Sequence, residues 1–134
     1  MDTNILIEKA LLARKKAYCP YSGISVGAAL LTKSGRIYTG ANIESASFSP
    51  TVCAERVAFF NAIHDGERDF CAIAIVGGEA NKTPTGHFPP CGVCRQVMAE
   101  FCNDDFKVIL NHGDKTETYT LCEMLPMSFN KDFI

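Results

Sequence analysis

The chain has 134 residues, of which 47% are hydrophobic and 21% charged, and its formal net charge is −2. This size and composition fit one globular domain over residues 1–134. The acidic balance argues against a nucleic-acid polymer as partner, and the nearest basic cluster, Arg14 to Lys16, is interpreted as a solvated helical face. Because the sequence shows neither a signal-peptide pattern nor an apolar run of about 18 residues, we expect a soluble cytoplasmic protein with no membrane partner.

Hydrophobic periodicity and turn residues divide the chain into helices and strands. The predicted elements are, in chain order, a helix over 4–18, strands over 26–32 and 37–41, a helix over 53–63, a strand over 70–76, a helix over 91–101 and strands over 107–111 and 116–120. We expect Pro20 to stop the first helix and Gly77-Gly78 to close the strand over 70–76. This order predicts an α/β fold whose mixed sheet is covered by helices, with a parallel central portion where helical crossovers join strands.

The seven cysteines are better explained by metal binding than by a disulfide framework. Their number is odd, no export signal is visible, and Cys91 and Cys94 form a C-x-x-C motif. Other cysteines are expected to act as small buried hydrophobic residues. These are Cys19, Cys71, Cys102 and Cys122.

Two short segments carry the strongest chemical signal. Cys53-Ala54-Glu55-Arg56 and Pro90-Cys91-Gly92-Val93-Cys94 offer three thiols and a carboxylate at predicted helix starts, where the partial positive charge favours thiolates. Three protein ligands would leave zinc a fourth position open for water. Glu55 is interpreted as the acid and base that moves the water's proton, because burial would raise the pKa of its carboxyl. Arg56, or else Arg95, would offset the negative charge of three thiolates around Zn²⁺.

A structural zinc knuckle is the alternative, and it would need a fourth protein ligand. His87, Cys102 or another cysteine could supply it. We favour the open site, with His87 as a loop or pocket-rim residue. His64 and His112 are expected to be ordinary helix-end and turn residues.

With these motifs, the chain closely resembles the small homotetrameric cytidine deaminases of pyrimidine salvage, from the first helix to Phe129. The segments that carry the resemblance are Pro20-Tyr21-Ser22, Val26-Gly27-Ala28-Ala29, Asn42-Ile43-Glu44, Cys53-Ala54-Glu55-Arg56, Pro90-Cys91-Gly92-Val93-Cys94-Arg95-Gln96 and Leu125-Pro126-Met127-Ser128-Phe129. The resemblance implies a three-layer α/β/α fold with a mixed five-stranded sheet. It also implies hydrolytic deamination of cytidine and 2′-deoxycytidine to the uridine nucleosides and ammonia.

Roles for individual residues follow from the same resemblance. It assigns one Zn²⁺ per subunit to Cys53, Cys91 and Cys94, and proton transfer to Glu55. It also assigns a ribose clamp to Asn42 and Glu44, backbone contacts with the base to Ala54, and an aromatic contact from a neighbouring subunit to Phe129. The active sites would therefore be composite, and the isolated subunit poorly active.

Three departures from the family pattern touch the expected pocket or its rim. Ile24 stands where family members often have Phe, Ser45 stands where Asn is common, and the loop before Cys91 looks longer than in many members. Ile24 would replace an aromatic contact with the base by aliphatic packing. The longer loop would be a lid or a surface feature.

Other functions are compatible with the same motifs. A deaminase for aminonucleoside antibiotics of the blasticidin S type shares the metal segments, and Asn42-Ile43-Glu44 favours a nucleoside instead because it offers a grip on the ribose diol. A polynucleotide-editing deaminase is disfavoured by the acidic balance. A zinc-binding module without catalysis is the remaining alternative.

Overall fold

A mixed sheet runs through the centre of the structure, a computed structural model that describes residues 2–84 and 86–134. The strands are β1 (Ile24–Thr32), β2 (Ile37–Ala41), β3 (Phe70–Glu79), β4 (Lys107–His112) and β5 (Lys115–Thr120). They lie in the order β2-β1-β3-β4-β5, with β3 and β4 parallel and every other neighbouring pair antiparallel. The expected five-stranded mixed sheet is therefore confirmed.

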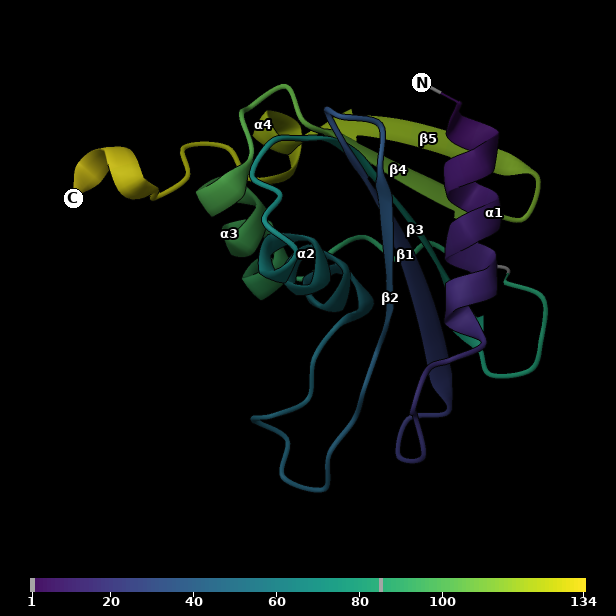
Figure 1. The fold of residues 1–134 in the computed structure, drawn as a ribbon. Helices are drawn as coiled ribbons and strands as arrows, with labels where there is room; N and C mark the ends of the chain where they lie inside the picture. Colours follow the sequence, from purple (N-terminus) through teal and green to yellow (C-terminus); the bar gives the residue numbers. More distant parts are fainter. Residues whose placement is uncertain (1, 85) are drawn as a thin grey trace.

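Helices cover both faces of this sheet (Figure 1). Helix α1 (Thr3–Arg14) packs on one face through Leu6, Ile7 and Ala10, against small strand residues such as Ala29 and Ala74. Helices α2 (Ala54–His64) and α3 (Gly92–Phe101) bury a larger core around Phe59 on the other face. The short α4 (Leu121–Met124) and a 3-10 turn (Lys131–Phe133) complete the chain. The fold therefore has three layers, with the sheet between helices. Within residues 2–84 and 86–134, no helix is long and apolar enough to cross a membrane.

The predicted parallel central portion is present as one pair of strands. The crossover through α3 joins the adjacent parallel strands β3 and β4. Strands β2 and β3, joined through α2, both run antiparallel to β1 and so are parallel to each other, but β1 lies between them. The prediction that Gly77-Gly78 closes the strand was wrong, because β1 starts early enough to pair Val26 with Gly77 and Ser25 with Gly78.

Helix α1 ends at Arg14, four residues before the predicted end, because the chain then pairs with another segment. Tyr18 N donates to Asn42 O at 3.0 Å, and Glu44 N donates to Tyr18 O at 2.9 Å. The prediction of a solvated face was wrong for Arg14, which is 8% exposed. Its guanidinium donates to the carbonyl oxygens of Ser25, Glu79 and Lys82, and so ties the end of the helix to the end of the β1–β3 pairing where β1 starts and β3 stops.

All seven cysteines are free thiols. Cys71 and Cys102 are partly buried and pack against the two cores, broadly as expected of small hydrophobic residues. Cys19 is also partly buried. The same expectation was wrong for Cys122, which is exposed on the one-turn helix α4. A helix of a single turn has too little surface to bury all of its side chains.

Gly40 on β2 allows α2 to approach the sheet closely. A Cβ atom built at this position would lie 2.5 Å from Ala54 O and 2.5 Å from Ala58 N, both backbone atoms that cannot swing aside. The contact involves the first residue of α2, next to Cys53 and Glu55. Any side chain at position 40 would therefore push the start of this helix away.

We predict that Gly40→Ala destabilises the protein by about 1–3 kcal/mol, the usual cost of overpacking a tight contact. Urea unfolding of the metal-loaded protein measures this as a lower midpoint. Gly92→Ala is the matched control, because a Cβ atom there meets nothing within 4 Å. Equal midpoints for Gly40→Ala and the parent protein would contradict the close approach.

Candidate metal and catalytic site

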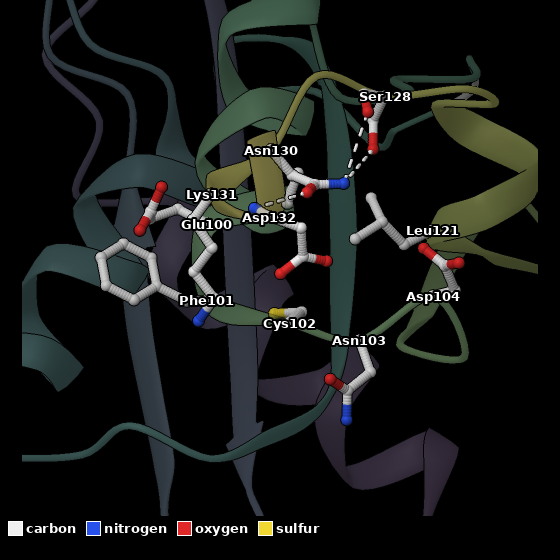
Figure 2. A pocket seen from close by; sticks show the side chains of 11 residues that line it. Glu100, Phe101, Cys102, Asn103, Asp104, Leu121, Ser128, Asn130, Lys131 and Asp132 are labelled. Atoms are coloured by element: carbon white, nitrogen blue, oxygen red, sulfur yellow. Dashed lines mark hydrogen bonds between the residues drawn. The ribbon is translucent and has the colours of Figure 1, made fainter. Parts of the chain in front are cut away.

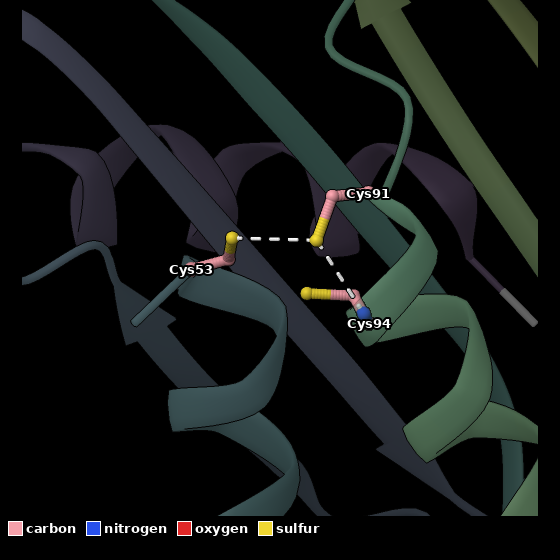
Figure 3. A group of neighbouring side chains, drawn as sticks. All are labelled: Cys53, Cys91 and Cys94. Carbon is pink, nitrogen blue, oxygen red and sulfur yellow. Dashed lines mark hydrogen bonds between the residues drawn. The ribbon is translucent and has the colours of Figure 1, made fainter. Parts of the chain in front are cut away.

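Two helix starts bring three thiols together. Cys53 is the N-cap of α2 and Cys91 the N-cap of α3, while Cys94 lies in the first turn of α3. Figure 3 shows the three sulfur atoms pointing into the space between the two helices. Cys53 Sγ lies 3.7 Å from Cys91 Sγ, and all three Sγ atoms lie within 4.8 Å of one another. This grouping joins residues that are far apart in sequence.

The surroundings of the thiols favour a negative charge on Cys53. A hydrogen bond with the Cys94 thiol, helped by Arg56 and Cys91, outweighs burial and lowers the pKa of Cys53 to about 5. The same pairing raises the pKa of Cys94, which is fully buried. Arg56 Nη2 donates to Cys53 Sγ at 3.5 Å. The Arg95 side chain instead donates to backbone carbonyls of Pro90 and Met124, at 2.7 and 2.6 Å.

Glu55 lies beside the thiols at the second position of α2 and is only 4% exposed. Burial is the main cause that raises the pKa of its carboxyl to about 7, and the negative charge of Cys53 adds to it. A carboxyl with this pKa gains or loses a proton easily near neutral pH. The position therefore suits a group that shuttles protons.

A cavity of about 300 Å³ opens above Glu55 and two of the thiols. It is lined by Ser22, Ile24, Val26, Asn42, Glu44, Thr51, Val52, Cys53, Ala54, Glu55, Phe88, Pro89 and Cys91. Its volume is at the lower end of the range for small-molecule sites. Cys53, Cys91 and Glu55 thus share one cavity with Asn42 and Glu44.

The segment with Asn42 and Glu44 is held on both sides by backbone pairing. Ile43 forms one bridge with Tyr18 and another with Val52, the residue just before Cys53. Asn42 Oδ1 accepts from Val26 N at 2.8 Å, and its Nδ2 donates to Ile24 O at 2.9 Å. An amide has two donors and two acceptor sites, so one of each stays available to a ligand.

Glu44 is oriented by residues that the sequence pattern had not assigned a role. The backbone N–H groups of Tyr21 and Ser22 donate to its Oε1 at 3.0 and 3.1 Å, and the Ser22 hydroxyl donates to Oε2. The hydroxyl hydrogen bond is the main cause that lowers the pKa of Glu44, so the carboxylate is ionised and ready to accept from a ligand. The Pro20-Tyr21-Ser22 motif was the available signal for this support.

Two further residues complete the rim. Phe88 packs over Gly77, where a Cβ atom would lie 2.7 Å from its ring, and it lines the cavity just before Pro89 and Cys91. Ile24 lines the same cavity, while Ser45 lies in an adjoining hollow, where its N–H donates to Thr51 Oγ1 at 3.0 Å. Sequence analysis gave Phe88 no role, because no pattern near it in the sequence indicates that its ring packs on Gly77.

Two sequence candidates lie elsewhere in this chain. Phe129 is 62% exposed on the C-terminal tail, stacked on Phe133, and does not line the cavity of its own chain. His87 lies with His112 and Glu117, apart from the three thiols. Among the described residues, the thiol group therefore contains no fourth His, Cys, Asp or Glu.

A separate cavity of about 410 Å³ lies between the end of α3 and the C-terminal tail (Figure 2). It shares no residue with the cavity above Glu55. Its one thiol, Cys102, has its pKa raised to about 12 by burial, so it is a poor nucleophile and metal ligand at neutral pH. This cavity therefore offers no reactive thiol of its own.

A family model, a sequence relative and a solved structure all relate this chain to cytidine deaminases. Residues 2–110 match the family model described as the cytidine and deoxycytidylate deaminase zinc-binding region. A cytidine deaminase from Halalkalibacterium halodurans is 51% identical over 98% of this chain and 97% of its own length. The crystal structure of a cytidine deaminase from Burkholderia pseudomallei superposes with a TM-score of 0.88 at 42% identity, covering 96% of this chain and 100% of that one.

A more distant relative carries the alternative activity. A blasticidin-S deaminase from Bacillus cereus is 32% identical over 80% of this chain and 78% of its own length. The cytidine deaminases match more of the chain at higher identity. Together with the thiols and carboxylate at the starts of α2 and α3, these comparisons show that the chain belongs to the cytidine and deoxycytidylate deaminase zinc-binding family.

Proposed function

We propose that this chain catalyses the zinc-dependent hydrolytic deamination of cytidine and 2′-deoxycytidine to uridine and 2′-deoxyuridine, with release of ammonia. The observation that carries the proposal is one cavity lined by Glu55, two of the three grouped thiols, Asn42 and Glu44. The thiols and Glu55 suit attack on an amidine carbon, and Asn42 and Glu44 suit a ribose. We further propose that residues 1–134 act as one domain, in pyrimidine salvage in the cytoplasm.

The donor set suits zinc. Zn–S bonds of about 2.3 Å at a tetrahedral angle place two sulfurs about 3.8 Å apart, and Cys53 Sγ and Cys91 Sγ are 3.7 Å apart. The Arg56 guanidinium, which is always protonated in proteins, donates to Cys53 Sγ and so places a positive charge beside the thiolates. Cys53, Cys91 and Cys94 would hold the ion. When bound, zinc supplies a Lewis acid that lowers the pKa of a coordinated water.

Glu55 would carry the protons of the reaction. Its carboxylate takes a proton from the attacking water and gives it to N3 of the cytosine ring, while the oxygen adds to C4. It then takes the remaining hydroxyl proton and gives it to the amino nitrogen, which leaves as ammonia. Burial supports this role, because the raised pKa of Glu55 lets the same oxygen accept and donate in turn.

Asn42 and Glu44 would position the sugar. The free N–H of Asn42 and the ionised carboxylate of Glu44 complement ribose hydroxyls, and the hydrogen bonds from Ser22 and Tyr21 hold the carboxylate in place. A free base would leave these polar groups without partners, so the pocket would select the nucleoside. The backbone of Ala54, at the cavity wall, would contact the base.

Assembly would complete the site. We propose a homotetramer in which Phe129 of a neighbouring subunit packs near the pyrimidine ring. The support is the exposure of apolar residues on the tail, including Met127, Phe129 and Phe133, which leaves a surface that monomeric proteins seldom present to water. The tail extends from the rest of the chain beyond α4 (Figure 1).

The support of the thiolates by Arg56 can be tested by removing its charge. We predict that Arg56→Gln lowers zinc affinity about 10–100-fold, the usual effect of losing a group that supports metal ligands. Competition with a chromogenic chelator measures the affinity. Arg68→Gln is the control, because that guanidinium donates only to the carbonyls of Ile63 and Glu67 away from the thiols. Unchanged zinc affinity in Arg56→Gln would remove this role.

Glu55→Gln tests the proposed reaction most directly. We predict a folded protein that keeps one zinc per chain and loses about 10²–10⁴-fold in kcat with cytidine, because the amide cannot shuttle protons. Ammonia release, circular dichroism and metal analysis check the three parts. Glu8→Gln, at an exposed position of α1, is the control. Full activity would reject the role of Glu55, and loss of zinc would indicate direct ligation.

A substrate panel separates the alternative functions. The parent protein should release ammonia from cytidine and 2′-deoxycytidine and be far slower with free cytosine. Turnover of blasticidin S alone would reassign the substrate. Zinc binding without turnover of any compound would favour a non-catalytic module.

Mixing two inactive variants tests the composite site. We predict that Phe129→Ala and Glu55→Gln chains, each poorly active alone, regain activity when their subunits are exchanged. In a mixed assembly, a Phe129→Ala subunit keeps its own Glu55 and receives Phe129 from its neighbour. Activity assays before and after exchange, with native mass spectrometry of the assemblies, check this. No gain in mixed assemblies would show that Phe129 does not act across subunits.

A further inference from the structure

A second group of potential metal ligands lies outside the deaminase pocket. His87 Nε2 lies 2.6 Å from Glu117 Oε1, and His112 Nε2 lies 2.9 Å from the same oxygen. The ligand atoms of the three residues lie within 4.8 Å of one another. The two imidazole rings meet edge to face, with centroids 4.0 Å apart. Three side chains thus direct metal-binding atoms at one point.

The β4–β5 hairpin provides two of these ligands in a fixed arrangement. In its register, His112 pairs with Lys115 and Leu110 pairs with Glu117. Since side chains alternate between the faces of a sheet, His112 and Glu117 lie on the same face, diagonally opposed. His87 joins them from the segment between β3 and α3. The site therefore joins the hairpin to one other segment of the chain.

Glu117 is oriented by a further hydrogen bond. Tyr119 OH donates to Glu117 Oε2 at 2.6 Å, which leaves Oε1 facing the two histidines. This bond, with those from His112 and His87, lowers the pKa of Glu117 to about 2. A ligating carboxylate held by a neighbouring hydroxyl is a common feature of metal sites.

We propose that His87, His112 and Glu117 bind a second divalent transition metal ion, Zn²⁺ or one of similar preference, separate from the thiol site. Imidazole nitrogen and carboxylate oxygen are ligands that zinc accepts, and three of them leave a position for water. The side chains are 43%, 22% and 39% exposed, respectively, so an ion has access from solvent. Zinc would place its ligands about 3.3 Å apart, so each hydrogen-bonded distance would open by less than about 1 Å.

Binding here would clamp the rim of the deaminase pocket to the edge of the sheet. His87 is followed directly by Phe88 and Pro89, which line the cavity, and then by Cys91. An ion between His87 and the hairpin would hold this segment against β4 and β5.

Calorimetric titration of ZnCl₂ into protein whose thiol site is already filled tests the proposal. We expect one further equivalent of zinc to bind, and mild EDTA treatment to remove it while the thiol-bound zinc stays. His87→Gln, His112→Gln and Glu117→Gln should each lose the second equivalent and keep the first. His64→Gln is the matched control, because His64 is the one histidine of the sequence outside the cluster and lies at the end of α2.

A fourth variant separates ligation from general damage to the hairpin. Tyr119→Phe keeps all three ligands and removes only the hydrogen bond to Glu117, so zinc affinity at the second site should fall about 10–100-fold. Retained zinc at the thiols shows that each variant is folded. The proposal is overturned if the parent protein binds one zinc only, or if the three ligand variants bind the second equivalent as His64→Gln does. In either case the cluster is only a set of shared hydrogen bonds.

Discussion

Two helix N-termini meet at one point, and the rest of the site is arranged around their contact. Cys53 begins α2 and Cys91 begins α3, so the partial positive charge of both helices faces the same three sulfurs. The thiols lie so close that the ionisation of Cys53 raises the pKa of Cys94. A divalent cation resolves this competition by accepting several thiolates at once. The buried Glu55 is held beside them because it follows Cys53 by two residues.

The close approach of α2 to the sheet makes this contact possible. Gly40 lets the backbone at Ala54 and Ala58 rest on β2. On the other face, α1 packs against the small residues Ala29, Ala72 and Ala74 of β1 and β3. The position of Asn42 and Glu44 depends on irregular pairing. Ile43, between them, forms bridges with Tyr18 and Val52, and both neighbours line the same cavity as Glu55. Core packing and the lining of this cavity are therefore parts of one arrangement.

The segment before α3 connects the deaminase pocket with the second group of ligands. Phe88 covers Gly77 at the rim, while the neighbouring His87 reaches the β4–β5 hairpin. Order in this segment would affect the position of Cys91 as well as the shape of the cavity. A site on the sheet edge could thus influence a site at the helix starts without any direct contact between them.

Local sequence determined most of the elements and the chemistry of the thiol site. The apolar runs of β1, β3 and β4, the spacing of Cys91 and Cys94 and the placement of Glu55 after Cys53 are all short-range patterns, so they could be interpreted from a few neighbouring residues. The tertiary structure alone decided what depends on residues distant in sequence. It buried Arg14 by giving it three carbonyl partners, directed Arg56 rather than Arg95 toward the thiols, placed Ser22 on Glu44, and joined His87 to His112 and Glu117. Periodicity reports which face of an element is buried, whereas strand order and side-chain partners depend on how the whole chain packs.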